Sequence, residues 1–97
     1  MLVLIAYDVE TATKAGRTRL RKVSKLCVNY GQRVQNSVFE CSVDPAQLVE
    51  IKHALNLIID DELDNVRIYH MGKNWERKIE ILGKNETYNP DTGILMI

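Results

Sequence analysis

The first seven residues, MLVLIAY, contain no charged side chain, and Asp8 ends this apolar run. A short continuous run of this kind predicts a strand that is buried on both faces. The run is too short to span a bilayer and has no basic leader, so we expect neither an anchor nor a signal peptide. A strand of this kind needs a sheet with other elements packed on it. A chain of 97 residues has room for one such domain.

A helix is predicted after this strand. Thr11 and Thr13 can cap its start, and the helix is expected to run to Tyr30. Gly31 then fits the left-handed position that ends many helices. At a spacing of 3.6 residues per turn, one apolar stripe is expected to face the core. Its members are Leu20, Val23, Cys27 and Tyr30.

Residues 32–43, QRVQNSVFECSV, alternate in polarity and break at the central NS pair, which predicts two short strands or one bent hairpin. A second helix should begin directly afterwards. Asp44 is placed to cap it, with Pro45 in the first helical position and Gln47 completing a capping box. The buried face of this helix is expected to consist of Leu48, Ile51, Leu55 and Ile58.

The acidic run DDELD marks the exit from the second helix, and VRIYHM reads as a fourth strand. The order strand, helix, strand, strand, helix, strand predicts a ferredoxin-like α+β domain over residues 1–97. Two more strand-like pieces, RKIEIL and ILMI, follow. They can be placed only at a sheet edge or on a neighbouring subunit. Because an exposed apolar tail invites aggregation, we expect residues 72–97 to form a dimerisation extension of a homodimer.

Charge is distributed unevenly along a chain whose formal net charge is zero. No acidic residue occurs between Glu10 and Glu40, whereas residues 40–64 contain only one lysine among seven acids. The acid-free interval carries Lys14, Arg17, Arg19, Arg21, Lys22, Lys25 and Arg33. A neutral protein with separate basic and acidic regions can bind an anion on one side.

Part of this basic interval is expected to bind nucleic acid. Arg17, Arg21 and Lys25 are spaced by four and form one stripe of the first helix, with Lys14 near its start. Arg33 extends the patch from the second strand. These cations can contact phosphates without reading sequence. The alternative is an ordinary solvated helix face, but the absence of interleaved acids favours phosphate binding.

Asp8 is the candidate for metal binding and catalysis. Ionisable residues at the end of a central strand are common metal ligands and acid-base groups, although Asp8 could also simply end the strand. Mg²⁺ commonly uses one or two protein carboxylates and takes its other ligands from water and phosphate. A two-fold dimer could bring two copies of Asp8 together. Glu10 is expected to be a solvated loop residue.

The sequence lacks the familiar phosphate-loop, dinucleotide-binding, zinc-protease and serine-hydrolase motifs. Cys27 and Cys41 fall within predicted regular elements and have no CxxC spacing, which argues against a disulfide framework or zinc site. We therefore expect a reduced cytoplasmic protein with no membrane association.

Several aromatic and histidine side chains have competing roles. Tyr7, Phe39 and Tyr69 could stack on bases, as aromatics do in RNA-recognition domains, but core or interface packing is favoured because no motif of that class is present. His70 is expected to be packed or hydrogen-bonded. Trp75 is interpreted as a packing or interface anchor.

Three motifs in fixed order carry a family resemblance: Tyr7-Asp8-Val9, Tyr30-Gly31 and RVQNSVFEC from Arg33 to Cys41. Together with the acidic helix exit and the VRIY and KIEILG segments, they resemble the CRISPR-associated protein two family over essentially the whole chain. This resemblance implies a ferredoxin-like homodimer whose C-terminal strands cross to the partner's sheet. It also implies that Asp8 binds Mg²⁺, with Mn²⁺ as a substitute.

The leading hypothesis is thus a Mg²⁺-dependent endonuclease of CRISPR spacer acquisition. The resemblance implies action on double-stranded DNA or single-stranded RNA, and we favour double-stranded DNA because a dimeric basic surface can span a duplex. The alternative is a non-catalytic DNA-binding scaffold that bridges the CRISPR integrase, CRISPR-associated protein one. A more remote alternative is a ligand-binding regulatory module, since fold does not determine function.

Overall fold

The protein is described by a computed structural model over residues 1–72 and 78–84. Within these ranges, five antiparallel strands form one sheet in the order β2-β3-β1-β4-β5. The elements are β1 (Leu2–Asp8), α1 (Lys14–Val28), β2 (Gly31–Gln35), β3 (Val38–Ser42), α2 (Pro45–Ile58), β4 (Asn65–His70) and β5 (Lys78–Gly83). The first six follow the predicted order and confirm the ferredoxin-like α+β fold.

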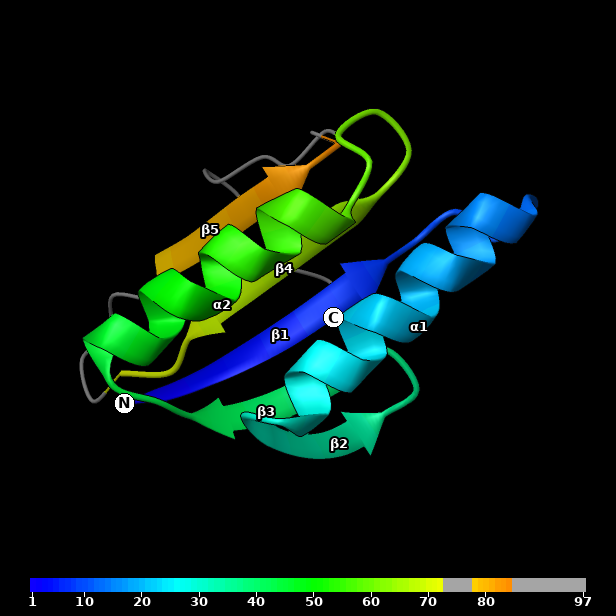
Figure 1. The fold of residues 1–97 in the computed structure, drawn as a ribbon. Coiled ribbons are helices and arrows are strands. Elements are labelled where there is room, and N and C mark those ends of the chain that lie inside the picture. The colour runs from blue at the N-terminus through cyan, green and yellow to red at the C-terminus, as the bar shows by residue number, and fades with distance from the viewer. Residues whose placement is uncertain (73–77, 85–97) are drawn as a thin grey trace, which may run out of the picture.

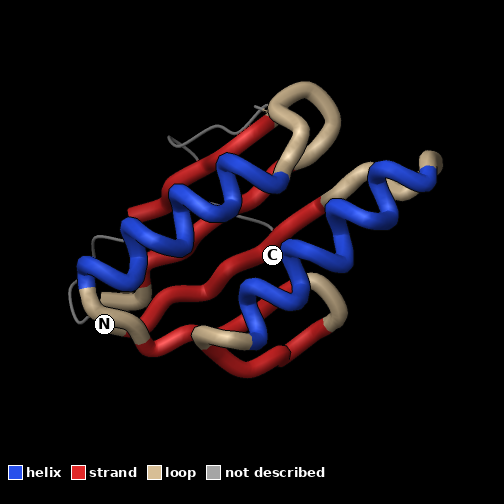
Figure 2. The backbone as a smooth tube through the Cα atoms, viewed as in Figure 1, coloured by secondary structure: helices blue, strands red, loops and turns tan. Residues whose placement is uncertain are grey.

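Both helices pack on the same face of the sheet (Figure 1). α1 lies over the β2 and β3 side, and α2 lies beside it over the β4 and β5 side (Figure 2). The sheet therefore has one face covered by helices and a second face that neither helix covers.

Neither helix among the described residues is both long and apolar enough to cross a membrane.

The two faces follow from strand alternation, because successive side chains of a strand point to opposite sides. Val3, Ile5 and Tyr7 of β1 are buried against the helices, whereas Leu4 and Ala6 are partly exposed. Within the described residues, helices thus cover β1 on one face, and its other face is partly exposed. We call the second side the helix-free face. The strand registers assign to it Leu4, Ala6, Asp8, Val38, Glu40, Asn65, Arg67, Tyr69, Ile79 and Ile81.

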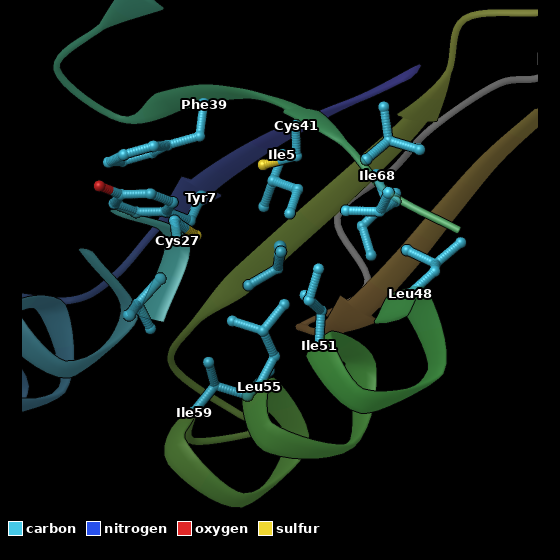
Figure 3. Close-up of a cluster of buried hydrophobic side chains, with 14 of the residues drawn as sticks. Ile5, Tyr7, Cys27, Phe39, Cys41, Leu48, Ile51, Leu55, Ile59 and Ile68 are labelled. Carbon is cyan, nitrogen blue, oxygen red and sulfur yellow. The ribbon is translucent and has the colours of Figure 1, made fainter. Parts of the chain in front are cut away.

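The core lies between the sheet and the helices (Figure 3). Tyr7 and Phe39 stack with ring centroids 6.2 Å apart and an interplanar angle of 24°, which confirms packing rather than base stacking for this pair. Cys27 and Cys41 are buried in the same cluster as free thiols, as expected. Leu48, Ile51 and Leu55 supply the buried face of α2.

Helix α1 begins as predicted and ends differently. Thr13 is its N-cap, and the side chain of Thr13 accepts a hydrogen bond of 3.0 Å from the Gly16 amide. The helix ends at Val28, and Gly31 is the first residue of β2 without a positive φ, so the predicted left-handed role of Gly31 is wrong. A Cβ at Gly31 would overlap the backbone carbonyl of Glu40 and the sulfur of Cys41. Glycine is needed there for close strand approach rather than for a turn.

Helix α2 confirms its predicted capping box. The Asp44 carboxylate accepts a hydrogen bond of 2.7 Å from the Gln47 amide, and the Gln47 side chain accepts one of 3.0 Å from the Asp44 amide. Pro45 occupies the first turn, where its missing amide proton costs no helical hydrogen bond. These local contacts fix the start of α2 independently of tertiary packing.

Strand β5 lies at the sheet edge beside β4 of the same chain, with His70 paired to Lys78 and Asn65 to Gly83. This is one of the two positions that the sequence left open for the additional strands. The second expected strand, ILMI, and Trp75 lie outside the described residues, so their dimer roles stay predictions. The Nε2 atom of His70 lies 2.6 Å from Oε2 of Glu80, a hydrogen-bond distance, which confirms its expected hydrogen-bonded environment.

Candidate nucleic-acid interface and metal ligand

Asp8 is the last residue of β1 and is exposed. It pairs in register with Asn65 of β4 and belongs to the helix-free face. Its carboxylate forms no hydrogen bond or ion pair with the described residues. An exposed carboxylate with free oxygens suits a hydrated Mg²⁺, for which one or two protein carboxylates are enough. No group of three or more metal-ligating side chains occurs among residues 1–72 and 78–84.

Glu10 lies in the loop after β1, as the sequence suggested, but is less solvated than expected. It is partly buried, and its carboxylate accepts a hydrogen bond from the Ala12 amide. The Glu10 amide donates a hydrogen bond of 3.0 Å to Oδ1 of Asp64. Glu10 thus stabilises the loop after Asp8, and the Glu10 carboxylate is hydrogen-bonded within that loop.

A cavity of about 670 Å³ lies between α1 and the β2–β3 hairpin. We call it the cationic pocket. Four cations line it, together with Tyr7, Leu20, Ser24, Asn36 and Ser37, and none of these described lining residues is acidic. The cations are Arg17, Arg21, Lys25 and Arg33. The structure therefore brings together four of the five predicted nucleic-acid-binding residues. Lys14 is exposed one turn earlier and is not among the lining residues.

Arg33 is the most firmly held of these cations. Its Nη1 donates a hydrogen bond of 3.0 Å to the Asn36 carbonyl, and its Nη2 donates one to the Ser24 hydroxyl. Its guanidinium lies 5.0 Å from the ring centroid of Phe39, within the range of a cation–π contact. These contacts tie the hairpin to α1 and fix one positive charge at the pocket wall.

The other three cations of the pocket form fewer contacts with the protein than Arg33 does. Arg17 donates a hydrogen bond of 3.2 Å to the Thr11 carbonyl. Arg21 and Lys25 are exposed, and neither forms a hydrogen bond or ion pair within the described part of the chain. A phosphate in the pocket can therefore displace water from these two cations without breaking an existing contact.

The buried ion pair between Arg19 and Asp64 was not expected from the sequence. Arg19 Nε lies 2.7 Å from Oδ2 of Asp64, whose side chain is fully buried. Asp64 also accepts hydrogen bonds from the amides of Asp60 and Glu10, at 2.8 and 3.0 Å. One signal was available: Arg19 lies between Arg17 and Arg21 in sequence, so the helical period turns its side chain away from the basic stripe.

This ion pair shifts both pKa values. Burial alone would raise the pKa of Asp64, but the hydrogen bonds from Arg19 and the amides of Asp60 and Glu10 outweigh it and lower the pKa. The hydrogen bond to Asp64 raises the pKa of Arg19. Asp64 thus stays ionised at neutral pH and joins α1, the loop after β1 and the start of β4.

The two candidate sites lie on opposite sides of the sheet. Tyr7 lines the cationic pocket on the helix side, whereas Asp8, the next residue, belongs to the helix-free face. Alternation along β1 enforces this separation. Within one chain, the candidate metal ligand and the candidate phosphate-binding pocket therefore do not share a surface.

The chain is similar to known proteins in sequence and in fold. Residues 1–79 match the family model described as CRISPR associated protein Cas2. The chain is 58% identical over 83 residues to a CRISPR-associated endonuclease Cas2 of Halalkalibacterium halodurans, covering 86% of each chain. It is 55% identical over 86 residues to a CRISPR-associated endoribonuclease Cas2 of Chlorobaculum tepidum, covering 89% of this chain and 90% of the relative.

A solved structure shows the same fold. The crystal structure of Streptococcus pyogenes Cas2 at pH 6.5 superposes with a TM-score of 0.71 and 67% sequence identity. The similarity covers 77% of this chain and 90% of that one. The fold and the order of the elements are therefore shared with a protein determined by experiment.

Proposed function

Because this chain belongs to the CRISPR associated protein Cas2 family, we propose that it is a Mg²⁺-dependent endonuclease that hydrolyses phosphodiester bonds during CRISPR spacer acquisition. The observation that carries this proposal is the exposed Asp8 carboxylate, which has no partner among the described residues and ends a central strand. The relatives named as endonuclease and endoribonuclease support phosphodiester hydrolysis as the reaction class.

Asp8 is the residue that would hold the cation. Bound Mg²⁺ would activate water and stabilise the negative charge that develops on the phosphate. The Asp8 carboxylate supplies an oxygen ligand, and Mn²⁺ satisfies the same ligand preference. The Asp64 network holds the loop that follows Asp8, through the Glu10 amide, and so limits the movement of the strand end.

The proposed substrate is double-stranded DNA, with single-stranded RNA as the alternative. The cationic pocket offers charge for phosphates and shows no group that would select a base or a 2′-hydroxyl. Two such pockets in a homodimer would span more of a duplex than one. The names of the relatives include both a general endonuclease and an endoribonuclease, which is why the assay must compare the two substrates.

The proposed assembly is a homodimer formed through the helix-free face and residues 72–97. Leu4, Ala6, Ile79 and Ile81 give that face an apolar centre. Covering it with a second copy would remove apolar area from water and place two copies of Asp8 in one assembly. The proposed setting is the cytoplasm, where thiols such as Cys27 stay reduced.

A second candidate function is a non-catalytic scaffold that holds DNA for the CRISPR integrase, CRISPR-associated protein one. It is favoured by the separation of Asp8 from the cationic pocket. A duplex bound in the pocket needs no contact with Asp8. Binding and cleavage can therefore be separated by mutation.

The test compares wild type, Asp8→Asn and Asp61→Asn. Asp61 is an exposed aspartate of the α2–β4 loop and serves as the matched control. Cleavage of duplex DNA and single-stranded RNA is measured with Mg²⁺ and with chelator. We expect Asp8→Asn alone to lose Mg²⁺-dependent cleavage while DNA binding is retained. Equal cleavage by Asp8→Asn and wild type would mean a different site or a contaminating nuclease, whereas the absence of Mg²⁺-dependent cleavage in wild type would leave the scaffold function.

A further inference from the structure

The cationic pocket is bounded on three sides. Helix α1 forms one wall and the β2–β3 hairpin forms the opposite wall (Figure 1), while Tyr7 of β1, which is buried, closes the inner side together with Leu20. The volume of about 670 Å³ falls within the range of about 300–1,000 Å³ that is typical of small-molecule sites. The pocket therefore has room for a short piece of one strand, and a duplex is too wide to enter it.

The pocket holds more positive charge than one phosphodiester can neutralise. Its cations are Arg17, Arg21, Lys25 and Arg33, and none of the described lining residues is acidic. Arg21 and Lys25 have no hydrogen-bond or ion-pair partner in the described part of the chain. An internal phosphodiester carries one negative charge, whereas a terminal phosphomonoester carries about −1.5 to −2 at pH 7. The additional charge of a monoester would therefore be attracted by cations that a diester leaves unneutralised.

Neutral donors surround the most firmly held cation of the pocket. Arg33 donates to the Asn36 carbonyl and to the Ser24 hydroxyl. The Ser24 oxygen accepts this bond, so the Ser24 hydroxyl proton is free to donate. The Asn36 side-chain amide and the Ser37 hydroxyl form no hydrogen bond within the described ranges. A phosphomonoester presents three terminal oxygens as acceptors, and an internal phosphodiester presents two. This set of donors suits the group that has more oxygens.

We infer that the cationic pocket binds the terminal phosphomonoester of a nucleic-acid strand in preference to an internal phosphodiester. The inference rests on the proposed nucleic-acid binding and names the ligand of that same site. Hydrolysis of a phosphodiester breaks one P–O bond, adds the elements of water, and leaves one strand end as a phosphomonoester and the other as a hydroxyl. Phosphodiester cleavage is thus the class of reaction that supplies this ligand. Because the pocket lies on the helix side of the sheet, binding there requires no access to the helix-free face.

The test compares single-stranded oligothymidylates that differ only at the 5′ end, which is a phosphate, a methyl phosphate or a hydroxyl. The methyl ester keeps the terminal phosphorus but removes the second charge. A second set carries the same three groups at the 3′ end. Each oligonucleotide has a fluorophore at its other end, and binding is measured by anisotropy in EDTA. We expect wild type to bind the phosphate about tenfold more tightly than the methyl phosphate in at least one set.

Substitutions assign this preference to the pocket. In the double variant Arg21→Gln/Lys25→Gln the preference should disappear. Lys22→Gln, at an exposed position outside the pocket lining, should keep it. All substituted positions are exposed, and circular dichroism checks that each variant is folded. Equal affinity of wild type for phosphate and methyl phosphate at both ends would overturn the inference. A preference that persisted in the folded double variant would overturn it as well.

Thymidine 5′-monophosphate distinguishes a strand end from a free nucleotide. Displacement of the oligonucleotide only at far higher concentrations of the mononucleotide would support the strand end as ligand, and equal potency would overturn it. The result is independent of the proposed cleavage, because no metal is present and Asp8→Asn should show the same preference as wild type. Equal affinities would leave the metal-ligand role of Asp8 intact, and a wild type that fails to cleave would leave the terminal preference intact.

Discussion

The Nε atom of Arg19 lies 2.7 Å from Oδ2 of Asp64, and this contact joins the middle of α1 to the residue immediately before β4. The Asp64 side chain is fully buried and also accepts hydrogen bonds from the backbone amides of Asp60 and Glu10. Groups from α1, from the loop after β1 and from the loop after α2 thus converge on one carboxylate. The loop after β1 is the one that follows Asp8.

Replacing Asp64 by asparagine should destabilise the fold strongly. The substitution keeps the size and one acceptor but leaves the Arg19 guanidinium without its countercharge. Removing one partner of a buried pair costs about 3–5 kcal/mol of unfolding free energy. In a domain of this size each kcal/mol lowers Tm by roughly 4–8 °C. Urea unfolding of wild type and Asp64→Asn at pH 7 measures the difference. Asp61→Asn, at an exposed site, should change stability by less than about 0.5 kcal/mol.

The same carboxylate predicts a pH dependence of stability. Its pKa is lowered in the folded state, because hydrogen bonds from Arg19 and two amides outweigh the opposing effect of burial. The stabilisation is therefore present above the unfolded-state pKa, about 3.9, and is lost as pH falls through the lower folded-state value. Thermal melts from pH 7 down to pH 2 should show the gap between wild type and Asp64→Asn closing in acid. A constant gap across this range would contradict the prediction.

Arg21 should contribute to the salt dependence of duplex binding. Each phosphate neutralised by a cation contributes about 0.9 to the slope of log Kobs against log salt. Arg21 lines the cationic pocket and has no partner among the described residues, so Arg21→Gln should reduce the magnitude of the slope by about 0.9. Lys22, its exposed neighbour outside the pocket lining, is the matched control. If Lys22→Gln reduced the slope equally, diffuse attraction rather than the pocket would explain binding.

The Cys27 thiol should be inert in the folded protein. Burial, with a smaller contribution from nearby Cys41, raises its pKa to about 12. Burial also raises the pKa of Cys41. Because the thiolate is the reactive species, neither cysteine should react with Ellman's reagent at pH 8 within minutes. Both should react at once in 6 M guanidinium, on the order of two thiols per chain. Rapid labelling of one thiol in the native protein would show that the core opens near α1.

Local signals predicted most of the fold. The Asp44 and Gln47 capping box, the apolar stripe of Val23 and Cys27, and the break between β2 and β3 all depend on residues close in sequence. Short-range patterns of this kind predict the local structure from neighbouring residues alone. Gly31 shows where they fail. Gly31 must be small because it lies close to β3, a strand that comes later in the sequence. A rule that considers only the residues near a helix end contains no information about that contact.

The candidate site was predictable to a similar extent. The four-residue spacing of Arg17, Arg21 and Lys25 placed them together, and Arg33, which was expected to extend this patch, lines the same cavity. Asp64 could not be identified, because its position within an acidic run suggests a solvated loop. Its burial depends on Arg19, 45 residues away in sequence. Partners at that separation are specified by tertiary packing and by nothing in the neighbouring residues.

The placement of Tyr7 and Asp8 on opposite sides of β1 has a consequence for substrate length. A nucleic acid that touches the cationic pocket must pass around the end of β1 to reach Asp8 of the same chain. A very short oligonucleotide can occupy one location or the other, but cannot bridge them. If Asp8 holds the cation as proposed, cleavage would require a nucleic acid of a minimum length, and shorter pieces that bind in the pocket would not be cut.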